Sequence, residues 1–66
     1  MNNKKITEES NTPEAVQLLD ELNSLFDTAG MKGYDMPHIR EISRQTNSTP
    51  ICVLKEHIEW MNTIVN

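Results

Sequence analysis

Residues 12–30 have the sequence TPEAVQLLDELNSLFDTAG, and this stretch predicts a long amphipathic helix. Thr12 is a suitable N-cap, and Pro13 suits the first helical position because no hydrogen-bond partner is needed there. Gly30 supplies a C-terminal stop. Between these signals, apolar residues recur every three or four positions and so share one helix face: Ala15, Leu18, Leu19, Leu22, Leu25, Phe26 and Ala29.

A second start signal, Thr49-Pro50, begins another long helix. Its apolar stripe consists of Ile51, Leu54, Ile58, Met61 and Val65, and it is widened by Val53, Trp60 and Ile64. Between the two long helices, Asp35 can cap a short helix that ends near Gln45. No segment alternates apolar and polar residues as a half-buried strand does. The sequence therefore predicts an all-α protein, a small three-helix bundle (long, short, long) in one domain over residues 12–66.

The N-terminal segment has a different composition. After Met1, residues 2–11 contain one large apolar residue, Ile6, among Asn, Lys, Thr, Glu and Ser. A segment of this kind offers little apolar surface to offset the entropy lost on ordering. We therefore predict a disordered N-terminal arm over residues 1–11.

Composition excludes several classes of function. The chain has 66 residues, enough for one small domain, and a net charge of −4. Nucleic-acid binding depends largely on neutralising phosphates, so an acidic chain is a poor candidate for it. A single cysteine, Cys52, cannot form an intrachain disulfide, and no apolar run has the length of a secretory signal or a membrane span. We expect a cytoplasmic protein that contacts neither nucleic acid nor membrane directly.

No group of residues has the pattern of a catalytic or metal site. Asp35, His38 and Glu41 lie at helical spacing, which is typical of a solvated face, whereas zinc needs three or four convergent ligands. Cys52 could pair with His38 or His57 as a nucleophile, but a free cysteine in a helix is usually a packing residue. We expect no enzymatic activity, no cofactor and no small-molecule substrate.

A helix-turn-helix is an alternative interpretation. This motif consists of two helices joined by a short turn, and its segment lengths are roughly matched by residues 39–46, the turn after them and the helix from Ile51. The second of these helices would read DNA. That helix carries Lys55 against Glu56 and Glu59, which is a poor complement to a phosphate groove. Packing within a helical bundle is our preferred interpretation, and a DNA-binding regulator stays open as the alternative.

Large apolar side chains gather near the connector between the first two predicted helices. Met31, Tyr34 and Met36 lie there, and Trp60 lies at the edge of the last helix's apolar stripe. A short middle helix cannot cover all of them. Methionines and aromatic residues are typical anchors of protein interfaces, so this cluster predicts a docking patch for another protein.

Four segments between residues 20 and 58 form a series: DELN at 20–23, TAGM at 28–31, YDMPHIRE at 34–41 and VLKEHI at 53–58. In order and near-spacing, this series resembles the DNA polymerase III theta subunit family, which includes phage-carried homologues. The most specific part is the run that begins at Tyr34. The family is similarly a small, non-enzymatic protein of three helices in long, short, long order, whereas this chain has a shorter connector before Gly33 and a more acidic charge.

The resemblance implies a protein that binds and stabilises the proofreading exonuclease (epsilon) subunit of a bacterial replicase. Carried over by position, the implied partner-binding residues are Leu22, Phe26, Met31, Tyr34, Met36, Pro37 and Ile39. The acidic charge also leaves open a third function, an anti-repressor or inhibitor that binds a basic regulatory protein.

Overall fold

The computed structural model describes residues 3–65, which form four α-helices and no strand. The helices are α1 (Asn3–Ser10), α2 (Pro13–Thr28), α3 (Met36–Gln45) and α4 (Pro50–Val65). The all-α prediction is confirmed, and the predicted long, short, long series corresponds to α2, α3 and α4. The structure departs from the predicted three-helix bundle by the additional helix α1. Residues 1, 2 and 66, which belong to the predicted arm and domain, lie outside the described residues.

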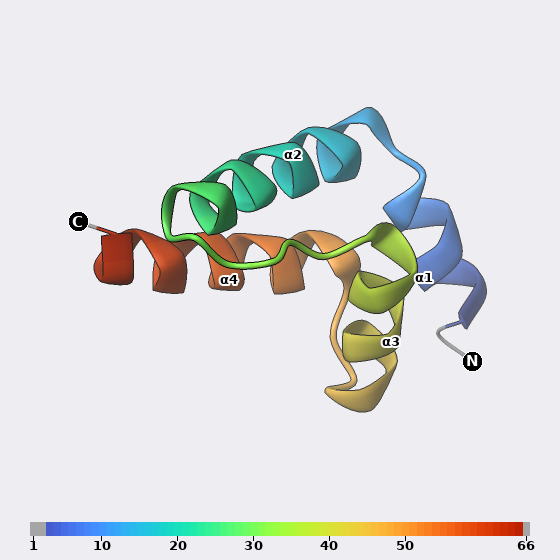
Figure 1. Cartoon of the computed structure of the whole chain (residues 1–66). Coiled ribbons are helices and arrows are strands. Elements are labelled where there is room, and N and C mark those ends of the chain that lie inside the picture. The colour runs from blue at the N-terminus through green and yellow to red at the C-terminus, as the bar shows by residue number, and fades with distance from the viewer. Residues whose placement is uncertain (1–2, 66) are drawn as a thin grey trace.

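The two long helices form the main body of the protein. α2 and α4 lie side by side and run in the same direction, and they make the most extensive helix-to-helix contact (Figure 1). α3 projects from the end of this pair where both long helices begin, and α1 packs beside α3 and the start of α4 (Figure 1). Because α2 and α4 are parallel, the chain must return along their length before α4 can start.

The ends of α2 follow the predicted signals. The Thr12 hydroxyl accepts a hydrogen bond from the Ala15 N–H (3.2 Å) and donates one to the Glu9 carbonyl (2.7 Å), so this residue joins α1 to α2. At the other end, Gly30 has φ 72°, in the left-handed region that glycine adopts without steric cost. The stop predicted at this glycine is confirmed.

The apolar stripes of α2 and α4 face each other and α3 to make the core. The buried core residues are Ala15, Leu22, Phe26, Ile39, Val53, Leu54, Ile58 and Met61. Those on α2 and α4 lie on the apolar stripes that the sequence predicts for these two helices. The periodicity therefore predicted which faces are buried.

α1 was not predicted, and it is held by contacts with distant parts of the chain. Ile6 is only 2% exposed, and the Glu9 carboxylate accepts a hydrogen bond from the Ile51 N–H at the start of α4 (2.9 Å). The Arg40 guanidinium of α3 donates to the Ser10 hydroxyl (3.2 Å). An isolated helix of this length is unstable in water, so these tertiary contacts are what order it. The prediction of a disordered arm is therefore wrong for residues 3–10.

The connector between α2 and α3 runs back along the α2–α4 pair without helical structure (Figure 1). The Tyr34 N–H donates to Asn23 Oδ1 (2.8 Å), and Asn23 Nδ2 donates to the Tyr34 carbonyl (2.9 Å). A Cβ on Gly33 would lie 2.8 Å from Asn23 Cγ, so only glycine lets the connector approach this closely. We call these two bonds the Asn23–Tyr34 hydrogen-bond pair.

We expect Asn23→Ala to lower the free energy of unfolding by about 1–3 kcal/mol, because both main-chain groups of Tyr34 lose their partner. Urea denaturation followed by circular dichroism measures the change. The matched control is Asn62→Ala on the exposed side of α4. Equal stabilities of the two variants would contradict a structural role for the Asn23–Tyr34 hydrogen-bond pair.

A second pair of variants tests α1. We expect Ile6→Ala to cost about 2–5 kcal/mol, as for other buried isoleucines. Ile64→Ala removes the same atoms from a side chain that is 51% exposed, and it should cost much less. If both substitutions have the same small effect in urea denaturation, α1 does not pack as described.

Candidate interaction surface

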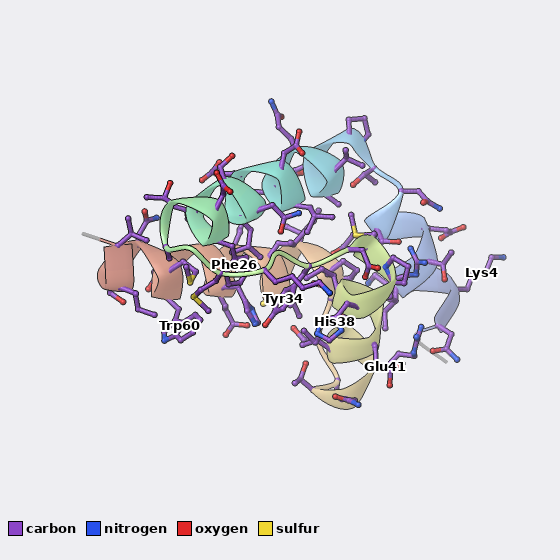
Figure 2. All side chains as sticks on the ribbon, in the orientation of Figure 1. Lys4, Phe26, Tyr34, His38, Glu41 and Trp60 are labelled. Atoms are coloured by element: carbon purple, nitrogen blue, oxygen red, sulfur yellow. The ribbon has the colours of Figure 1, made fainter. Side chains whose placement is uncertain are left out.

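Tyr34 lies at the centre of an aromatic cluster that reaches the surface (Figure 2). Its ring centroid is 4.9 Å from that of Phe26 in the core, 4.6 Å from that of His38 on α3 and 5.9 Å from that of His57 on α4. These tilted and edge-on arrangements are favourable for aromatic pairs. The main chain of Tyr34 is held by its hydrogen bonds with Asn23, and its ring is held by the neighbouring aromatic rings. Both parts of the residue are therefore immobilised.

Trp60 lies beside this cluster and is 52% exposed. Together with Tyr34, Glu56 and His57 it lines a shallow depression of about 420 Å³, and we call these four residues the Tyr34–Trp60 surface. The His57 ring is anchored, because its Nδ1 lies 2.8 Å from the Val53 carbonyl oxygen and must donate to it. An exposed tryptophan beside immobilised aromatic rings is typical of an interface anchor.

The predicted partner-binding residues divide into two groups. Three of them are buried in the core with at most 1% exposure: Leu22, Phe26 and Ile39. The other four reach the surface wholly or in part: Met31, Tyr34, Met36 and Pro37. The first group cannot touch a partner of the folded protein, because these side chains fill the space between α2, α3 and α4. The predicted patch is thus corrected to its four accessible residues.

The sequence did not predict that Glu56 and His57 of α4 belong to the Tyr34–Trp60 surface. Trp60 was named as a candidate for the docking patch, at the edge of the last helix's apolar stripe, and His57 as a possible partner of Cys52 in catalysis. Their proximity to Tyr34 follows from the return of the connector along α4, which no local pattern specifies. A lone tryptophan at a stripe edge was the available signal.

The residues considered for a metal or catalytic site either have structural roles or do not come together. Within residues 3–65, no set of three His, Cys, Asp or Glu side chains could hold a metal ion. Asp35 caps α3 by accepting a hydrogen bond from the His38 N–H (3.0 Å), and Glu41 forms an ion pair with Arg44 (3.0 Å). Cys52 is exposed on α4.

The helix-turn-helix alternative can be compared with the charges on α4. The turn between α3 and α4 contains Asn47 at φ 56°, in the left-handed region. Lys55 lies on the exposed side of α4 within a depression that is also lined by four carboxylates: Glu9, Glu14, Glu56 and Glu59. This excess of negative charge on and around the helix that would read DNA opposes contact with phosphates.

Among residues 3–65, no helix combines the length and the apolar character needed to cross a membrane. Comparison of the chain with models of protein families, with curated proteins and with solved structures finds no match. Membership of the theta subunit family therefore stays a prediction that rests on the four sequence segments.

The structure gives Trp60 a role at the surface and Tyr34 a role in the fold, so the two residues should differ in their effect on stability. We expect Trp60→Ala to change the free energy of unfolding by at most about 1 kcal/mol, the range of substitutions away from the core. Tyr34→Ala should cost at least about 2 kcal/mol, because the ring packs on Phe26 in the core. Urea denaturation of both variants checks this order, and a reversed order would mean that Trp60 serves the fold rather than a partner.

Proposed function

We propose that this chain is a non-enzymatic accessory protein in DNA replication that binds another protein through the Tyr34–Trp60 surface. The proposed partner is the proofreading exonuclease (epsilon) subunit of a bacterial replicase, and the proposed compartment is the cytoplasm. In this proposal α2, α3 and α4 correspond to the three helices of the theta subunit family, and α1 is an addition to them.

One observation carries the proposal: an exposed tryptophan shares a depression with a tyrosine whose main chain and ring are both immobilised. Trp60 offers a large apolar surface to a partner, and Tyr34 is already fixed by Asn23 and Phe26. Binding then costs little conformational entropy on this side of the interface. Rigid aromatic side chains of this kind contribute most of the binding energy in many interfaces.

The segments that carry the resemblance also lie together in the fold. Asn23 ends the DELN segment and Tyr34 begins the YDMPHIRE segment, and the Asn23–Tyr34 hydrogen-bond pair joins them. His57 belongs to the VLKEHI segment and contacts the Tyr34 ring. Residues from three separate segments of the resemblance therefore meet at one surface, which supports a shared function for these segments.

The test is a titration with the purified exonuclease subunit, read by size exclusion and by thermal melting of the mixture. We expect a stoichiometric complex and a higher melting temperature of the exonuclease, because a ligand that binds only the folded state stabilises it. Trp60→Ala should weaken the affinity by about tenfold or more, equivalent to about 1.4 kcal/mol.

The matched control is Val16→Ala, which shortens an equally exposed apolar side chain on α2 and should leave the affinity unchanged. Absence of a complex at tens of micromolar, on the order of −6 to −7 kcal/mol, would reject the exonuclease as partner. A complex that Trp60→Ala does not weaken would reject the Tyr34–Trp60 surface.

A further inference from the structure

The Tyr34–Trp60 surface continues along the exposed side of α4. A second shallow depression lies next to it and is lined by Glu56, Glu59, Trp60 and Thr63. The depression that contains Lys55 adjoins both, because Glu56 lines all three depressions and Glu59 lines two of them. One continuous surface thus has an aromatic end at Trp60 and an acidic end toward the start of α4.

The charges on this surface are strongly unbalanced. Lys55 is the one lysine or arginine that lines it, and its Nζ lies 3.9 Å from Glu14 Oε2 with both side chains about 60% exposed. An ion pair this exposed is screened by solvent. Within residues 3–65, neither Glu56 nor Glu59 forms a salt bridge. Both residues are exposed and line the same depression as Trp60, and the Glu56 carboxylate accepts a weak hydrogen bond from the neutral Cys52 thiol (3.7 Å), which leaves its charge unbalanced.

We infer that the protein segment that docks on Trp60 is cationic, with lysine or arginine side chains next to an apolar anchor. This inference rests on the proposed function, since it concerns the partner of the same surface. Glu56 and Trp60 are four residues apart on α4 and Glu56 and Glu59 three apart, so all three share one helix face.

An arginine or lysine on this face can interact with the indole and a carboxylate at the same time. A guanidinium or ammonium group is attracted to the face of tryptophan, and a guanidinium also binds a carboxylate with two parallel hydrogen bonds. The carboxylates select against acidic segments by like-charge repulsion. Complementary charge also accelerates association, and salt weakens that effect.

The first experiment measures the dissociation constant with the exonuclease subunit at several salt concentrations. We expect Glu56→Lys/Glu59→Lys to weaken binding at least about tenfold at low salt and to flatten the salt dependence. The matched control is Asp20→Lys/Glu21→Lys, which makes the same charge change on the exposed side of α2 and should leave both properties close to wild type. Equal losses in the two double variants would overturn the inference.

The second experiment does not depend on the exonuclease. Trp60 is the only tryptophan of the chain, so its emission reports on this surface directly. We expect a tryptophan-free helical peptide of lysine and leucine to shift this emission in the wild type and in Asp20→Lys/Glu21→Lys. The shift should be lost in Glu56→Lys/Glu59→Lys, and a matched peptide of glutamate and leucine should cause none.

These outcomes separate the two proposals. A shift with the cationic peptide but no complex with the exonuclease subunit rejects the proposed partner and retains a cationic docking segment. No shift with the cationic peptide, an equal shift with the acidic peptide, or a shift that survives Glu56→Lys/Glu59→Lys overturns the inference about charge. Circular dichroism of each variant confirms that helix content is unchanged.

Discussion

The parallel arrangement of α2 and α4 is the constraint on which the rest of the fold depends. A helix of 16 residues such as α2 is about 24 Å long. Ala29 and Gly30 form the turn that ends α2, and the five residues 31–35 that follow span at most about 17–18 Å when fully extended. These five residues must therefore run nearly straight to return along α2. Asn23 supplies partners for Tyr34 at this point, and Gly33 lets the two segments approach.

The same return of the connector creates the candidate interaction surface. It brings Tyr34 over the core at Phe26 and beside His57 and Trp60 of α4. The contacts of Tyr34 with Asn23 and Phe26 thus stabilise the fold and also fix the position of the aromatic rings at the surface. A small domain gains from such an arrangement, because it needs no flexible loop to present an anchor to a partner.

Local patterns predicted α2, α3 and α4 well, because capping and apolar periodicity act over three or four residues. They failed for α1, whose order depends on a hydrogen bond between Glu9 and Ile51, far apart in the chain. The resemblance, not the local pattern, placed Leu22 and Ile39 in a partner-binding patch, although apolar positions of this periodicity are the ones that fill a core. A resemblance between sequences assigns residues to a patch by their position in the chain, and it does not show which of them are buried.

By itself, the sequence determined the all-α class, the caps of α2 and α3, and the faces that the core uses, since each of these depends on interactions within one or two helical turns. Only the tertiary structure decided that residues 3–10 are helical, that α2 and α4 run in parallel, and that Trp60 remains exposed beside Tyr34. Those features depend on contacts between residues distant in the chain, and such contacts leave no periodic or capping signal in the sequence.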